Sequence, residues 1–226
     1  MSDMIRAQEL VRAGENFCSS GEFGKAAVAW RECLALVQGE GLAEHEQTLD
    51  LMSNLVFALT SAGEHVEAVG FGRKCLALRQ RVLGTEHRDT LRTMSQLASV
   101  LGDAGEHAEA VRSWRECLAL QQTLLGKEHE RTMETMSVLM GALVFAGEHA
   151  EAVRIGRECL ALKQRVLGEE HENTLTTMHN LAFALRKKGE SAEAVRVFRE
   201  CLALRQRVLD EEHKDTLLTM HELAFA

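Results

Sequence analysis

Cysteine and histidine are the side chains of this sequence with the widest chemistry, since thiolates and imidazoles bind metals and serve as nucleophiles or bases. Both residue types recur at a constant interval of 42 residues. An interval this regular predicts one structural position in each unit of a repeat, and not one cluster of reactive groups. The cysteines of the series are Cys33, Cys75, Cys117, Cys159 and Cys201. The histidines are His45, His87, His129, His171 and His213.

The repeat argues against the chemistry that these residue types could carry together. Packed helices lie about 8–10 Å apart, whereas a disulfide needs Cα atoms within about 7 Å and zinc needs ligands at about 2.0–2.3 Å. We therefore expect the five cysteines to be buried, small apolar residues of a reducing compartment. Each loop histidine is expected to cap the next helix or to fix the turn before it; a ladder of weak metal sites is the alternative. The sequence predicts no metal, no cofactor and no catalytic residue.

The composition narrows the class of protein further. Proline is absent, which fits an all-helical chain because proline breaks helix interiors. The formal net charge is -8 with both signs interspersed, so no basic patch favours nucleic acid. No apolar run reaches the roughly 18 residues that span a bilayer, and the first residues lack the apolar stretch of a secretory signal. We expect a cytoplasmic protein without nucleic-acid or membrane partners.

Each unit has the pattern of two helices. Within residues 48–87, apolar side chains fall at helical spacing until Gly63, and a second apolar stripe ends at Gly84. Glycine is typical just beyond a helix end. The pattern predicts a helix of about 14 residues, a tight turn and a helix of about 18 residues. Arg79 and Arg81 fall near the end of the second helix, where positive charge complements the helix dipole.

The residues at these positions resemble those of a known family. The third unit reads Met94-x2-Leu97-Ala98-x2-Leu101, then Ala110-x3-Trp114. This is similar to the tetratricopeptide pattern W-x2-L-G-x2-Y, then A-x3-F, whose usual period is about 34 residues. The longer period lengthens the second helix and its loop, and in this the chain resembles the repeats of kinesin light chains. It departs from them after the loop histidine, where they usually have proline and this chain has Glu46, Arg88, Glu130, Glu172 and Lys214.

The resemblance implies an all-α fold, a right-handed α-solenoid (superhelix) of antiparallel helix hairpins. It extends over residues 1–226 as a single array. The hairpins are expected at 6–41, 48–83, 90–125, 132–167 and 174–209, followed by a terminal helix at 216–226. That last helix keeps the interior pattern, so it is expected to pair with a second copy or with the amino-terminal helix, giving a homo-oligomer. The alternative is a monomer in which the last helix frays.

A second regularity alternates from one unit to the next. One position of the second helix is alternately large and small: Trp30, Gly72, Trp114, Gly156 and Phe198. One position of the first helix changes in the opposite sense: Gly14, Val56, Ala98, Met140 and Ala182. Because interiors are packed to near-crystal density, this compensation predicts two alternating types of hairpin, with Trp114 largely buried. Chance is the alternative.

The function follows from the resemblance, which implies that the first helices line a concave groove. Asn54 and Asn180 match asparagines that hold the backbone of a bound peptide, and a side-chain amide both donates and accepts hydrogen bonds. Phenylalanines would supply apolar pockets and arginines would bind carboxylates. The candidate peptide-binding residues are Asn54, Phe57, Arg92, Gln96, His179, Asn180, Phe183 and Arg186.

The predicted function is therefore a non-enzymatic scaffold that binds proteins or peptides in this groove. Inward residues differ between units while the outer motifs repeat closely, which favours binding. The alternative is a structural or self-assembling array, a spacer or filament without a dedicated peptide ligand.

Overall fold

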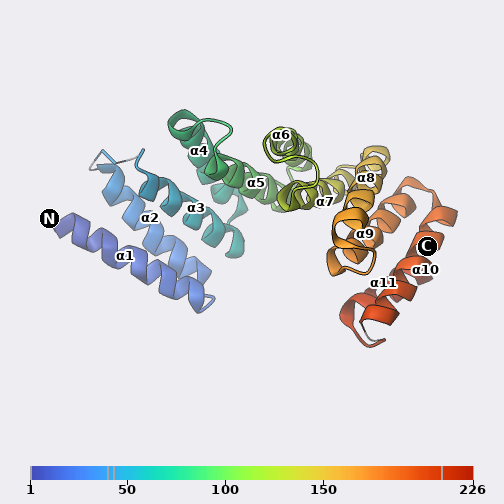
Figure 1. Ribbon diagram of the computed structural model, residues 1–226. Helices are drawn as coiled ribbons and strands as arrows, with labels where there is room; N and C mark the ends of the chain where they lie inside the picture. Colours follow the sequence, from blue (N-terminus) through green and yellow to red (C-terminus); the bar gives the residue numbers. More distant parts are fainter. Residues whose placement is uncertain (1, 40, 43, 210, 226) are drawn as a thin grey trace. The chain divides into compact units, whose positions relative to one another are not determined.

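A computed structural model describes residues 2–39, 41–42, 44–209 and 211–225, and these form 11 helices (Figure 1). Met1, Glu40 and Ala226 belong to the expected ranges 1–226, 6–41 and 216–226 but lie outside the described residues. None of the described helices combines the length and the apolar character needed to cross a membrane. The helices are α1 (Ser2–Ser19), α2 (Phe23–Gly39), α3 (Glu46–Ser61), α4 (His65–Leu83), α5 (Arg88–Asp103), α6 (His107–Leu125), α7 (Glu130–Phe145), α8 (His149–Leu167), α9 (Glu172–Lys188), α10 (Ser191–Val208) and α11 (Lys214–Ala224).

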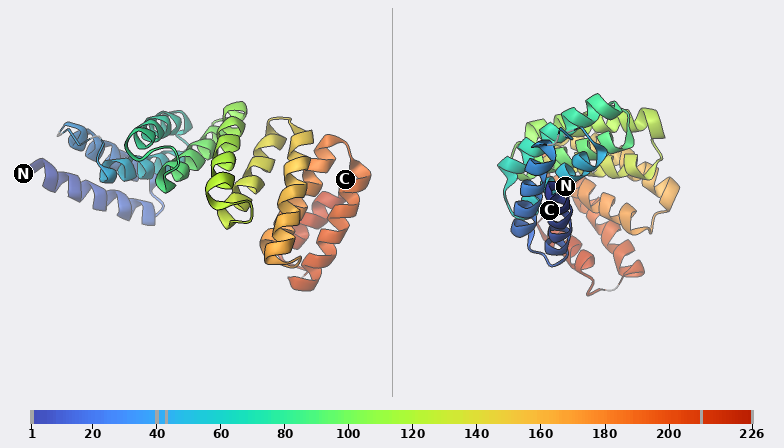
Figure 2. Two further views of the ribbon diagram at one scale, coloured as in Figure 1. Left: turned by 45° about the horizontal axis from the view of Figure 1, so that its top comes forward. Right: turned by 90° about the vertical axis from the view of Figure 1, so that its left-hand side faces the viewer.

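The helices pack in the order of the sequence, within two compact units. In the unit Met1–Ser113, each helix from α1 to α4 lies against the next one, and α3 also contacts α5 (Figure 1). In the unit Trp114–Ala226, each helix from α7 to α10 lies against the next one, and α7 also contacts α9 (Figure 2). The odd-numbered helices are the first helices of the hairpins and the even-numbered ones are the second helices. The expected all-α array of helix hairpins is confirmed.

The turn inside a hairpin is built around a glycine. After α3, Gly63 has a φ of 81°, a left-handed conformation that is free of strain only for glycine. The Glu64 N–H then donates to the Leu59 carbonyl at 2.8 Å, and the Gly63 N–H donates to the Thr60 carbonyl at 3.0 Å. These two bonds satisfy carbonyls that the helix end leaves without partners, so the second helix starts at once in the opposite direction.

The loop histidines cap the first helices, as predicted. The Nδ1 atom of His171 accepts a hydrogen bond from the Asn173 N–H at 3.1 Å, at the start of α9. The same bond begins α5, α7 and α11, from His87, His129 and His213. His45 has the same extended backbone before α3 but makes no side-chain cap bond. An acceptor at this position satisfies one of the free N–H groups of the first turn.

The cysteines of the repeat lie in the core, and the described structure contains them as free thiols. Cys75 is buried and its Sγ lies 3.4 Å from the Leu49 carbonyl of the first helix in the same hairpin. The same contact, at the same distance, is made by Cys33, Cys159 and Cys201. Each cysteine therefore fills a small space where two helices approach closely. Cys18, outside the series, is half-buried.

At Gly14 and Gly156 the alternation of large and small residues is a direct packing contact within one hairpin, whereas a Cβ atom on Gly72 would meet Leu97 of α5 at 3.0 Å. A Cβ atom added to Gly14 would lie 2.2 Å from Nε1 of Trp30, so the indole occupies the space that a side chain on α1 would need. In α8 the roles are reversed, because a Cβ on Gly156 would lie 2.5 Å from Sδ of Met140. Trp114 is 6% exposed, which confirms that it is largely buried.

Candidate functional site

The candidate site lies on the first helices. We use the term first-helix face for the side chains of α3 and α5 in one unit, and of α7, α9 and α11 in the other, that do not pack into the core. The two units are described separately. The contact of α3 with α5, and that of α7 with α9, makes this face continuous from one hairpin to the next within each unit.

In the first unit, two of the candidate residues stand out from α3. Asn54 is exposed, and so is Phe57, whose side chain keeps 53% of its surface accessible. The Phe57 ring meets the edge of Phe23 from α2, with ring centroids 5.9 Å apart. An exposed aromatic ring held by a second ring offers a rigid apolar contact beside an amide that both donates and accepts.

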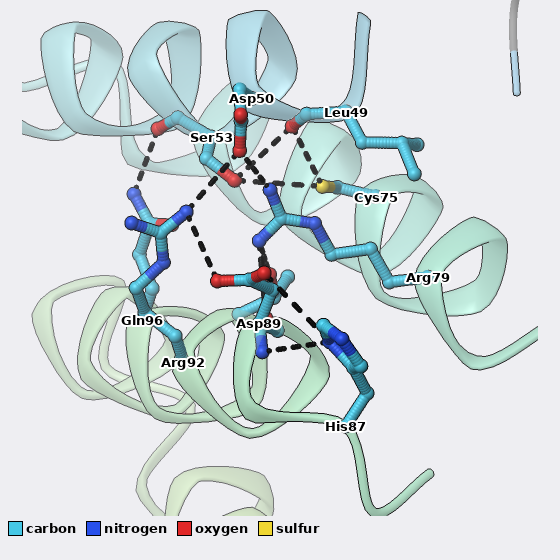
Figure 3. A network of polar contacts seen from close by, with 10 residues as sticks. Leu49, Asp50, Ser53, Cys75, Arg79, His87, Asp89, Arg92 and Gln96 are labelled. Atoms are coloured by element: carbon cyan, nitrogen blue, oxygen red, sulfur yellow. Dashed lines mark hydrogen bonds and ion pairs between the residues drawn. The ribbon is translucent and has the colours of Figure 1, made fainter. Parts of the chain in front are cut away.

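The other two candidates of this unit connect α5 to α3. Arg92 donates from Nη2 to Oδ1 of Asp50 at 3.2 Å, and Gln96 donates from Nε2 to the Ser53 carbonyl at 2.8 Å (Figure 3). Arg92 remains exposed and Gln96 is half-buried. These bonds hold the two side chains in place before any ligand arrives.

Arg79 belongs to the same network, and its burial is not evident from the sequence. Its place near the end of α4 predicts a charge that complements the helix dipole, and the structure shows in addition that Arg79 is buried, with only 1% of its surface exposed. Nη2 donates to Oδ1 of Asp50 at 2.5 Å, while Nη1 donates to the Asp89 carbonyl at 3.0 Å and to Oγ1 of Thr93 at 2.7 Å (Figure 3). Asp50, whose side chain is half exposed, therefore lies between a buried guanidinium and the exposed one of Arg92.

The second unit presents a different surface. On α9, Asn180 and Phe183 are half-buried. Two cations approach the Phe183 ring, with Cζ of Arg186 at 5.1 Å and Nζ of Lys187 at 5.3 Å from its centroid. Arg186 also pairs with Glu222 of α11 at 2.5 Å. The ring and its cations form one cluster, which cation–π attraction stabilises.

His179 lies beneath this surface. It is 7% exposed, its Nδ1 lies 3.2 Å from Oγ1 of Thr219 in α11, and its ring meets Phe198 of α10 edge-on at 5.4 Å. Burial, together with the charge of Arg205, lowers the pKa of His179 to about 4. The imidazole is therefore neutral at physiological pH. It joins α9, the helix that carries Asn180 and Phe183, to α10 and α11, and it is too buried to contact a ligand itself.

Arg79 shares a buried polar position with other units, which sequence reasoning did not identify. Arg79, Gln121, Lys163 and Arg205 are 42 residues apart and all are buried. Nζ of Lys163 donates to Oγ of Ser137 at 2.8 Å and to Oγ1 of Thr177 at 2.9 Å, and burial lowers its pKa. The available signal was a polar side chain recurring at a fixed position of the second helix. The three cations each join their own hairpin to the next, through bonds from Arg79, Lys163 and Arg205 to the following first helix.

Family matches agree with this architecture. The sequence matches the tetratricopeptide repeat over residues 47–123, 89–165, 141–207 and 175–226, which is well over half of its length. The chain belongs to the tetratricopeptide repeat family. Arrays of this family generally mediate protein binding and typically have no enzymatic activity. Comparison with curated proteins gives no significant match.

Solved structures share the fold at low sequence identity. A Podosopora anserina protein, described as a kinesin light chain with nearly identical TPR-like repeats, has a TM-score of 0.82 and 24% identity, over 90% of this chain and 97% of that one. BtubC (BKLC) from P. vanneervenii has a TM-score of 0.67 and 17% identity, over 100% of this chain and 83% of that one. The apo form of RapI has a TM-score of 0.79 and 14% identity, over 100% of this chain and 61% of that one. The resemblance to kinesin-light-chain-like repeats is thus confirmed for the fold.

Proposed function

We propose that this protein is a non-enzymatic scaffold that binds a protein or peptide on its first-helix face. One observation carries the proposal. Phe57 is exposed on the same helix face as the amide of Asn54, and Phe183 is half-exposed beside the guanidinium of Arg186, although the core residues beneath them recur closely from unit to unit. Apolar rings beside fixed hydrogen-bonding groups are what an interaction surface requires. Arg92 and Gln96 are held by hydrogen bonds to α3, so less side-chain entropy would be lost when a ligand contacts them.

The ligand that fits this surface is an extended or short helical peptide. On α9 it would contact Asn180 through its backbone, Phe183 through an apolar side chain and Arg186 through an acceptor. His179 would support these contacts from below. Because a small polar interface rarely gives high affinity, one unit alone should bind in the micromolar range, about −8 kcal/mol.

A binding selection tests the proposal. A library of random peptides is selected on the immobilised full chain and on the double variant Asn54→Ala/Asn180→Ala. We expect the wild-type chain to enrich peptides whose binding the double variant reduces. The matched control is Asn16→Ala, since Asn16 is an exposed asparagine of α1 outside the candidate set. Enriched peptides that bind the double variant and the triple variant of Asn180, Phe183 and Arg186 undiminished would place the site elsewhere.

The alternative function is a structural or self-assembling array. Exposed Leu217, Leu218 and Met220 on α11 favour it, because contiguous exposed apolar side chains mark interaction sites. This alternative predicts that the peptide selection enriches nothing.

A further inference from the structure

The buried guanidinium of Arg205 stands in the same surroundings as that of Arg79, but without a carboxylate. From Nη1, Arg205 donates to the Asp215 carbonyl and to Oγ1 of Thr219, both at 2.6 Å. Arg79 makes the same two bonds to Asp89 and Thr93, and in addition donates from Nη2 to Asp50 (Figure 3). Among the described residues, no carboxylate oxygen lies within 4.0 Å of the Arg205 nitrogens.

The difference originates at one position of the first helix. Asp50 precedes Arg79 by 29 residues. At the same offset before Lys163 stands Glu134, whose charge acts on that lysine. Before Arg205 the position holds Thr176, an exposed residue of α9 without charge. The neutral Gln121 has a cation, Arg92, at this offset. Of the three buried cations, Arg79 therefore pairs directly with an acidic residue at this position. Lys163 is attracted by one, Glu134, although its hydrogen bonds end on neutral oxygens, and Arg205 has none.

An unpaired charge at this depth is unfavourable. Arg205 is only 3% exposed, and its Nε, like that of Arg79, is buried without an acceptor. Removing a charge from water costs several kcal/mol unless a counter-charge and hydrogen bonds compensate for it. The two bonds from Nη1 end on neutral oxygens, so they supply hydrogen bonding but no counter-charge. Where Asp50 stands beside Arg79, the α9–α10 hairpin has Thr176, a shorter, exposed side chain that brings no charge to Arg205.

We propose that Arg205 is a ligand-binding residue and that the α9–α10–α11 junction binds a carboxylate of the protein or peptide partner, in the place that Asp50 takes beside Arg79. This inference rests on the proposed function and adds the chemistry of the ligand. The carboxylate would enter past Thr176, on the same face as Asn180. A charge-assisted bond from a largely desolvated arginine is strong, and it selects against the neutral amide of the same shape.

The first test needs no ligand. Thr176→Asp places a carboxylate where Asp50 stands in the other hairpin, and Thr176→Asn is the neutral control of equal size. We expect the aspartate variant to melt about 2–4 °C above the asparagine variant. The difference should disappear in an Arg205→Gln background, which the natural Gln121 shows to be compatible with this position. Equal melting temperatures of the two variants would show that the place is not open to a carboxylate and would overturn the proposal.

The second test uses three libraries of random decapeptides as the probe. Peptides of the first library carry a central Asp or Glu and an amidated carboxyl terminus. Those of the second, neutral library carry a central Asn or Gln and an amidated carboxyl terminus. Those of the third library carry a central Asn or Gln and a free carboxyl terminus. Preference for the first library identifies a side-chain carboxylate, and preference for the third identifies a terminal one. We expect the preferred library to bind about tenfold more tightly than the neutral one, and Arg205→Gln and Thr176→Asp to abolish that preference.

The control and the contrary outcomes separate this inference from the proposed function. Arg207→Gln changes an exposed arginine of the same helix and should leave the preference intact. Peptides that bind without any preference for carboxylates, or with a preference that Arg205→Gln leaves unchanged, would overturn the inference while the proposed function stands. If no library binds the wild-type chain, the result contradicts both this inference and the proposed function.

Discussion

Individual residues in this array take their role from the hairpin beside them. Serine occupies one position of α3 and α7, as Ser53 and Ser137, and His179 occupies it in α9. The serines accept or donate within the buried junctions, whereas the imidazole fills the space between α10 and α11. One position of the repeat thus carries out different tasks on an unchanged backbone.

Trp114 provides a prediction at this scale. Because its indole is buried, Trp114→Ala should lower the free energy of unfolding by roughly 3–5 kcal/mol, as large-to-small changes in a core do. Denaturant unfolding followed by circular dichroism measures the loss. Trp114→Phe is the matched control and should cost clearly less, since Phe198 fills the same position of α10. An unchanged unfolding midpoint for the alanine variant would contradict the packing account.

His179 gives a prediction about pH. The unfolded chain protonates this residue near its ordinary pKa of 6.5, whereas the folded chain does so only at about 4. Between these values the unfolded state binds more protons, so the unfolding free energy falls as pH falls from 6.5 to 4 and is unaffected above that range. The contribution is at most about 3 kcal/mol.

The measurement for His179 compares two proteins. Urea unfolding across pH 4–7 of the wild type and of His179→Ser, which copies Ser53 and Ser137, cancels the contributions of the shared carboxylates. We expect a shallower loss of stability for the serine variant over this range. Identical slopes for the two proteins would show that His179 is protonated as readily in the folded state as in the unfolded state.

At the scale of the element, the loop histidines explain how first helices start without proline. Nδ1 accepts the N–H two residues later, which a neutral imidazole can do and a protonated one cannot. His171→Ala should therefore lower the free energy of unfolding by about 1 kcal/mol, the usual effect of losing a cap. His171→Asn should lose much less, because asparagine also accepts a hydrogen bond at this position.

His45 serves as the internal control for this prediction. It precedes α3 in the same extended conformation but makes no cap bond, so His45→Ala should change the unfolding free energy less than His171→Ala. Thermal unfolding of the three variants and the wild type provides the comparison. Equal losses from the two alanine variants would show that the imidazoles act through packing and not through the cap bond.

At the scale of the whole molecule, association between copies is open to a direct test. Leu217, Leu218 and Met220 of α11 are about half exposed, and Met4 and Ile5 of α1 are exposed as well. We expect the chain to self-associate through these terminal helices, because burying such side chains is favourable. Light scattering over a wide range of protein concentration should show a mass that rises with concentration. Leu217→Lys/Met220→Lys should lower it, and a constant monomer mass for the wild type would contradict the prediction.

The sequence by itself determined the repeat, the helix pairs, the glycine turns, the histidine caps and the burial of cysteine, because each depends on residues close together in the chain or on a fixed period. It also indicated the compensation of Trp30 by Gly14, since both lie in one hairpin. The tertiary structure alone decided that Arg79 and Arg205 are buried and that His179 lies under its neighbours. Their surroundings come from separate helices, so a side chain that appears to be at a helix end is covered by another hairpin. Charge at such a junction is balanced across two helices, and only the structure shows that Asp50 balances Arg79 while the described residues leave Arg205 without a carboxylate.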